Sequence, residues 1–312
     1  MQPRDQKTLL VAMDVSERSK NTVKQLARID RFREYKIVLF HVFNPIQEIY
    51  WDLEIDPKAI VSEKDIFAWE AEKEKKTTDF MEQAQNLLVR SGFNKDFLAV
   101  KIQPRLKGAA RDFIAEARRG YHVSAIRRRG MLQDTSGIVG SVFSKLVEAI
   151  SFVPLLIIGK QPFSGNIIIG IDGSENALRA VDFVGELLGG SDCRVHLLSV
   201  VRRIQGFGQK QHQWQTLSKM IEPFFKRKLT ASLEESKKRL MVAGFTSEQL
   251  SAKVITGEDS RAGCLVQEAE RFGCDTIALG RKGLSQVMDF SMGGVTRKVI
   301  QLAQDKSIWV IN

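Results

Sequence analysis

The chain has 312 residues, a length typical of about two domains, and 43% of its residues are hydrophobic while 27% are charged, as in ordinary globular proteins. No apolar run approaches the ~20 residues that span a bilayer, and the first residues lack the layout of a signal peptide. With three cysteines in no metal-ligand spacing, we expect a cytoplasmic protein with reduced thiols and no metal site. The net charge of +10 is spread over both halves and forms no basic stripe with interleaved aromatic residues, which argues against nucleic-acid binding.

Short apolar runs alternate with helical patterns in the first half of the chain. Pro45 and Pro57 mark an irregular insertion after the second of these runs. The strands that we expect are residues 8–13, 36–42, 97–102, 123–126 and 154–158, and the helices are residues 16–29, 65–90, 109–119 and 143–148.

The same order restarts after residues 161–165, where we place a boundary between domains at 1–160 and 165–312. The expected strands of the second half are residues 167–171, 194–200, 251–255, 274–279 and 308–311. This alternation predicts an α/β fold in which two doubly wound parallel sheets of five strands follow each other in tandem. Ligands of such sheets bind beyond the carboxyl ends of the strands, where the strand order reverses.

A glycine-rich loop follows the fourth strand of each half. In the second half Gly280, Gly283 and Gly293 are separated by two and nine residues; in the first half Gly130 and Gly140 keep the spacing of nine. Glycine allows a close backbone approach, and the following helix start offers unpaired N–H groups and the positive end of a dipole. The pattern favours a phosphate cradle, with a tight turn as the alternative, and its repetition strengthens the former.

An aspartate ends the first strand of each half, at Asp14 and Asp172, and a valine ends the second strand, at Val42 and Val200. The offset between halves is five residues smaller at the glycine loop, which we assign to the insertion after the second strand. The aspartates are predicted to face the binding crevice, with a role as helix caps as the alternative.

The residues IGIDGS at 169–174, with the glycine spacing and a C-terminal apolar strand, resemble the universal stress protein family; the first half, with VAMDVS at 11–16, resembles it more loosely. The resemblance covers nearly the whole chain and implies a tandem protein of the adenine nucleotide alpha hydrolase-like fold. It further implies a stress-response module that binds ATP or another adenine nucleotide, with or without Mg.

The resemblance also implies the site residues, to which the loop cation Arg281 is added because it stands where a phosphate tail would lie. In the second half they are Asp172, Val200, Gly280, Arg281, Gly283, Gly293, Gly294, Val295 and Thr296. In the first half they are Asp14, Val42, Gly130, Gly140, Ser141 and Val142.

Two departures from the family pattern bear on these sites. Gly294 stands where the family usually has Ser or Thr, which removes a hydroxyl donor. Arg127 replaces the first loop glycine in the first half, where its side chain would either crowd a ligand or pair with a phosphate. We expect crowding, so the second half is the favoured site.

The sequence shows no set of nucleophile, base and acid that resembles a catalytic arrangement, so we expect at most weak ATP hydrolysis. The alternatives are a structural or partner-binding protein of the same fold that binds no nucleotide, and a slow ATPase. A protein partner is compatible with either, a membrane is not expected, and the chain would be a monomer with an internal pseudo-dimer or a homodimer. Because the family dimerises through its last strands, residues 155–158 and 308–311 are expected to approach each other.

Overall fold

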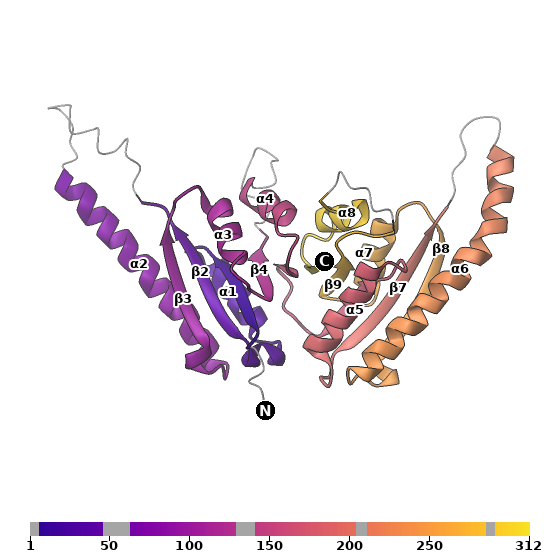
Figure 1. Cartoon of the computed structure of the whole chain (residues 1–312), viewed down its shortest axis with the longest axis horizontal. Helices are drawn as coiled ribbons and strands as arrows, with labels where there is room; N and C mark the ends of the chain where they lie inside the picture. The colour runs from indigo at the N-terminus through magenta and orange to yellow at the C-terminus, as the bar shows by residue number, and fades with distance from the viewer. Residues whose placement is uncertain (1–5, 46–62, 129–140, 204–210, 285–290) are drawn as a thin grey trace. The chain divides into compact units, whose positions relative to one another are not determined.

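The computed structural model describes residues 6–45, 63–128, 141–203, 211–284 and 291–312, without the side chains of 63–64, 141 and 211–219 (Figure 1). Contacts divide the described chain into two compact units. The first contains residues up to Arg127 together with 141–146, and the second contains Arg128 together with 147–312.

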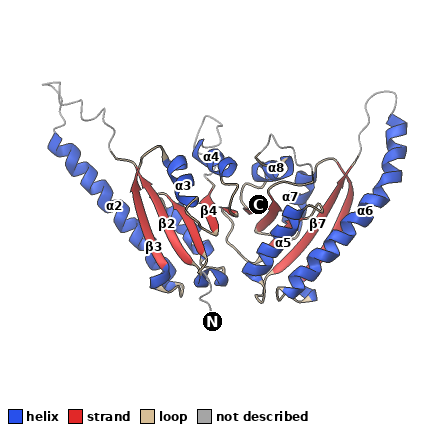
Figure 2. Cartoon of the chain, in the orientation of Figure 1, coloured by secondary structure: helices blue, strands red, loops and turns tan. Residues whose placement is uncertain are grey.

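The first unit is built on a parallel sheet with the strand order β3-β2-β1-β4. Figure 2 distinguishes its strands from its helices. The strands are β1 (Thr8–Met13), β2 (Lys36–Phe43), β3 (Leu98–Pro104) and β4 (Val123–Arg127), and the helices are α1 (Glu17–Leu26), α2 (Glu63–Arg90), α3 (Ala109–Ala117) and the first part of α4 (Ser141–Ala149).

The second unit has the strand order β5-β10-β9-β6-β7-β8, and its neighbours are parallel except for β5 and β10. Its helix α5 packs against α6, and α7 packs against α8 (Figure 1). The strands are β5 (Leu155–Ile158), β6 (Asn166–Gly170), β7 (Arg194–Arg202), β8 (Leu250–Glu258), β9 (Thr276–Gly280) and β10 (Ser307–Ile311), and the helices are α5 (Glu175–Leu188), α6 (Gln211–Val242), α7 (Arg261–Arg271) and α8 (Gly294–Leu302).

The structure confirms the predicted α/β class and the approach of the two last strands. β5 runs antiparallel to β10, with Trp309 opposite Leu156. This pairing adds β5 to the five strands expected of the second half, β6 to β10, so the sheet of the second unit has six strands. The expected domain boundary at residues 160–165 remains a prediction about the sequence repeat. Most of the expected insertion after β2 lies outside the described residues.

The strands β1 and β6 are buried on both faces, which explains their continuous apolar runs. Leu9, Leu10 and Val11 have no exposed surface, and neither do Ile167 to Ile169. A parallel strand that is covered by helices on both faces has no polar side to alternate with. The described helices include none that is long and apolar enough to cross a membrane.

One ion pair recurs in both units and confirms the internal repeat at the level of side chains. Lys101 on β3 pairs with Glu116 on α3 at 2.6 Å, and Lys253 on β8 pairs with Glu268 on α7 at 3.3 Å. The lysine-to-glutamate separation in sequence is the same in both cases. The repeat therefore conserves a contact between the third strand and the following helix, not only the order of elements.

Candidate functional site

The carboxyl ends of β6, β7, β8 and β9 border a cavity of about 700 Å³ in the second unit. It lies where the fold class predicts a ligand site. Eight of the nine residues expected of the second half line it: Asp172, Val200, Gly280, Gly283, Gly293, Gly294, Val295 and Thr296.

Asp172 lines this cavity and joins two loops. Its Oδ1 accepts a hydrogen bond from the backbone N–H of Ser174 at 2.9 Å, and its Oδ2 accepts one from the N–H of Leu284 at 3.2 Å. The α5 helix is capped by Ser174, whose hydroxyl accepts from the N–H of Ala177. The alternative interpretation of Asp172 as the helix cap is therefore wrong.

The loop glycines differ in why glycine is needed. A Cβ at Gly280 would lie 2.7 Å from the backbone carbon of Asn176, and one at Gly283 would lie 2.2 Å from Oδ2 of Asp172. A Cβ at Gly294 would meet no atom within 4 Å. Gly280 and Gly283 thus permit close packing within the protein, whereas Gly294 leaves open space.

The start of α8 faces the cavity with its backbone. Gly293 is the N-cap and provides no side-chain acceptor for the N–H groups of the first turn. Thr296 Oγ1 donates to the carbonyl of Gly280 at 2.9 Å, which fixes this helix start against the end of β9. The hydroxyl of Thr296 thus holds the loop in place, and the positive end of the helix dipole remains directed at the cavity.

Comparisons with known proteins give the family of this half of the chain. Residues 164–310 match the sequence model of the Universal stress protein family. This segment belongs to that family. The resemblance drawn from the glycine spacing is therefore confirmed, and the cavity lies within the matched universal stress protein domain.

Solved structures extend the likeness in fold beyond this segment. A universal stress protein from Archaeoglobus fulgidus DSM 4304 is 16% identical, covers 99% of both chains and superposes with a TM-score of 0.60. A functionally unknown protein from Pseudomonas aeruginosa PAO1 is 15% identical, with 98% of this chain and 92% of that chain covered and a TM-score of 0.58. At these identities the matches show the fold, and their full coverage supports the tandem form.

A further match concerns one half of the chain. A universal stress protein solved in complex with cAMP is 21% identical, with 47% of this chain and 95% of that chain covered and a TM-score of 0.34. The bound cAMP is a feature of that complex and is stated of that protein alone. No curated protein matches the sequence closely enough to count as a relative.

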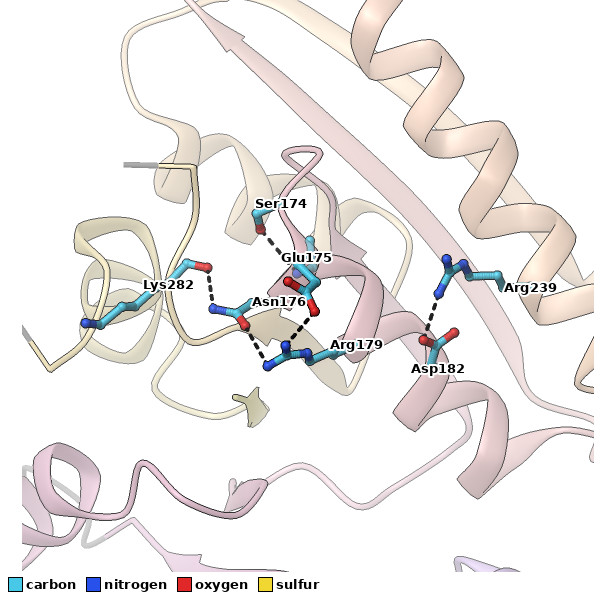
Figure 3. Close-up of polar contacts among 8 residues, drawn as sticks. Ser174, Glu175, Asn176, Arg179, Asp182, Arg239 and Lys282 are labelled. Atoms are coloured by element: carbon cyan, nitrogen blue, oxygen red, sulfur yellow. Dashed lines mark hydrogen bonds and ion pairs between the residues drawn. The ribbon is translucent and has the colours of Figure 1, made fainter. Parts of the chain in front are cut away.

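Arg281 is the one expected residue of the universal stress protein domain that does not line the cavity. Its side chain is 3% exposed, and its guanidinium donates to backbone carbonyls instead of pointing to a ligand. The expectation that it meets a phosphate does not agree with this geometry. The neighbouring Lys282 lines the cavity in its place, and its carbonyl accepts from Nδ2 of Asn176 at 3.1 Å (Figure 3).

Sequence reasoning missed one wall of the cavity. Helix α6 contributes Glu222, Phe225 and Leu229, which follow helical spacing and so share a face. Phe225 is 44% exposed although it lines the cavity. The helical period identifies such a face, but only the packing of α6 against the sheet shows that it faces the site.

The charged residues that line the described cavity are mostly basic. They are Arg202, Arg203, Arg261 and Lys282, against Asp172 and Glu222. Arg261 Nε donates to the carbonyl of Val200 at 3.2 Å. A cavity with this balance attracts an anionic ligand. The described residues contain no group of three or more His, Cys, Asp or Glu side chains that could hold a metal ion.

The corresponding region of the first unit differs at its centre. Asp14 accepts from the hydroxyls of Ser16 and Ser19, and Ser16 caps α1, so the cap interpretation is wrong for Asp14 as well. Arg127 extends to α1, where Nη1 donates to Oγ1 of Thr22 at 3.3 Å.

Burial lowers the pKa of Arg127, the nearby Arg18 lowers it further, and Asp14 opposes both. A partly buried cation thus stands near the aspartate, as expected if Arg127 crowds this crevice. Val42 is half-buried in β2 and Val142 is exposed in α4. Gly130, Gly140 and the side chain of Ser141 lie outside the described residues.

Proposed function

We propose that the second half of this chain binds an adenine nucleotide, ATP in the first instance, in the cavity at the carboxyl ends of β6 to β9. The observation that carries the proposal is the convergence of three features on one cavity. Asp172 follows the first strand of the domain, the glycine loop crosses beside it, and the uncapped start of α8 faces the same space.

The two ends of the cavity suit the two ends of a nucleotide. The phosphates lie against the N–H groups at the start of α8 and beside Lys282, because backbone donors and the dipole both favour negative charge there. The sugar and base lie along Asp172 and Val200, with Phe225 of α6 as an apolar wall. Arg202 and Arg203 add positive potential at the end of β7.

The site also fits the magnesium form of the nucleotide. Magnesium keeps several water ligands and binds to phosphates with few protein carboxylates, so the described site needs no dedicated metal cluster. The open space at Gly294 leaves room for phosphate oxygens beside the first turn of α8. Asp172 and Glu222 are the carboxylates that line the described cavity; neither is assigned a catalytic step.

The proposed role is that of a stress-response binding module. Binding of a nucleotide to the native state alone stabilises it by mass action, so occupancy can be read by a partner without any turnover. A slow ATPase and a partner-binding protein without nucleotide remain the alternatives. Measuring phosphate release with the same samples distinguishes a slow ATPase from a protein that binds ATP without hydrolysing it.

Titration calorimetry with ATP, ADP and adenosine tests the proposal. We expect ATP to bind with a stoichiometry near one per chain. Lys282→Met should lower the ATP affinity by about tenfold, because it removes a charge-assisted contact. Lys238→Met is the matched control, since Lys238 is exposed on α6 and does not line the cavity. Wild-type protein that binds none of the three ligands refutes the proposal.

A further inference from the structure

Arg281 is a buried cation that lies beside the proposed phosphate loop without facing the cavity. Its Nε donates to the carbonyl of Ser291 at 2.8 Å, within the returning part of the loop. Its other two nitrogens reach the carboxyl end of α4: Nη1 donates to Ile150 at 2.7 Å, and Nη2 donates to Val147 and Glu148, both at 2.8 Å.

The carboxyl end of α4 is suited to hold such a charge. The last carbonyls of a helix lack intrahelical partners, and the dipole places partial negative charge there. Burial lowers the pKa of Arg281 to about 10, with Glu148 acting in the opposite direction. The guanidinium therefore stays charged at neutral pH, with four carbonyl acceptors in place of water.

The backbone of Arg281 fixes the loop a second time. Its carbonyl accepts from the N–H of Gly293 at 2.9 Å, and its own N–H donates to the carbonyl of Ile311 at 2.6 Å. One residue thus joins the point where the chain leaves β9 to the point where it returns to α8. The distance between the two ends of the loop depends on this residue, and so does the position of the start of α8.

We infer that Arg281 is a positioning residue for the phosphate end of the site, which it secures by anchoring the glycine loop to the carboxyl end of α4. The inference rests on the proposed nucleotide binding. Residues 147–150 precede the segment 164–310 that matches the family. The support of the site therefore includes chain that lies outside the matched domain.

Comparison of ATP with adenosine tests the inference, because adenosine lacks the phosphates that the loop would hold. Arg281→Met keeps an unbranched apolar side chain, shorter than that of arginine, and removes its donors. We expect this variant to lose about tenfold or more in ATP affinity and to keep adenosine affinity within about twofold. A general loss of structure would lower the affinity for both ligands alike.

Arg281→Lys covers the case in which the methionine variant does not fold. Lysine keeps the charge but has one nitrogen, so it cannot reach Ser291 and the α4 carbonyls together. We expect an ATP affinity between those of Arg281→Met and the wild type. Arg239→Met is the matched control: Arg239 is 38% exposed, pairs with Asp182 at 2.9 Å (Figure 3) and lies away from the cavity lining. It should alter neither affinity.

Hydrogen exchange tests, without any ligand, whether Arg281 anchors the glycine loop. Arg281→Met and Arg281→Lys should speed exchange at the amides of Leu284 and Gly293, with β6 and β7 unchanged. Equal loss of ATP and adenosine, or unchanged ATP affinity, overturns the positioning role. If the wild type binds neither ligand, the proposed function is wrong. The anchor is then still decided by hydrogen exchange, and unchanged exchange at the loop refutes it.

Discussion

Adding a single methyl group at Gly283 is expected to displace the carboxylate of Asp172. A Cβ at this position would lie 2.2 Å from Oδ2 of Asp172, far inside van der Waals contact. Displacing the carboxylate also weakens its hydrogen bonds with the N–H groups of Ser174 and Leu284, at 2.9 and 3.2 Å. Overpacking and the weakened hydrogen bonds together lower the free energy of unfolding of Gly283→Ala by about 2–4 kcal/mol.

A double-mutant cycle shows whether Asp172 is the cause. Asp172→Ala removes the oxygen that the new methyl group would meet, so Gly283→Ala should cost about 1 kcal/mol or less in that background. The expected coupling energy between the two substitutions is about 1–3 kcal/mol. Urea unfolding of the wild type, both single variants and the double variant, followed by fluorescence and circular dichroism, gives the four free energies.

Gly294→Ala provides the control for adding a methyl group to this loop. Its Cβ would meet no atom within 4 Å, and alanine loses less chain entropy on folding than glycine, so stability should stay equal or rise by up to about 1 kcal/mol. The loss of unfolding free energy caused by Gly283→Ala is compared between the wild type and the Asp172→Ala background. If the two losses agree within about 0.5 kcal/mol, the proposed contact between the two loops is refuted.

Three further predictions concern the site and the core. Gly294→Ser places a hydroxyl in open space at the first residue of α8 and should raise ATP affinity about three- to tenfold; calorimetry showing no gain would contradict it. Wild-type protein should bind about one ATP per chain and Arg127→Gly about two, and two equivalent sites in the wild type would show that Arg127 does not crowd the first half. Burial raises the pKa of Cys264 to about 11 and that of Cys274 to about 12, from 9.0, so the unfolded thiols ionise first and stability falls as pH rises from about 9 to 12. Urea unfolding at several alkaline pH values should show a shallower decline for Cys274→Ala.

Features that depend on neighbouring residues could be predicted from the sequence. The helices of the first half follow from helical patterns between short apolar runs. Continuous apolar runs gave the buried strands, and the repeated order of elements gave the tandem organisation. The glycine spacing indicated the loop that lines the cavity, because the geometry of a βα turn depends on a short stretch of chain.

The reason for each glycine could not be predicted, because the neighbour that excludes a side chain is distant in sequence. Gly283 is limited by Asp172, and Gly280 is limited by Asn176. The sequence pattern attributed both to close approach of a phosphate. Their first requirement is packing within the protein: the end of β9 at Gly280 packs against the start of α5, and the loop at Gly283 packs against the loop that follows β6.

The sequence by itself determined the α/β class, the internal repeat and eight of the residues that line the second-half cavity, since these follow from periodicity and local turn chemistry. Tertiary structure decided that Arg281 turns away from the cavity to the carbonyls of α4, and that α6 provides a wall with Phe225. Each of these depends on which surfaces meet when strands and helices pack. A cation in a glycine loop has the same local pattern whether it faces a ligand or a helix end, and only the position of α4 distinguishes the two.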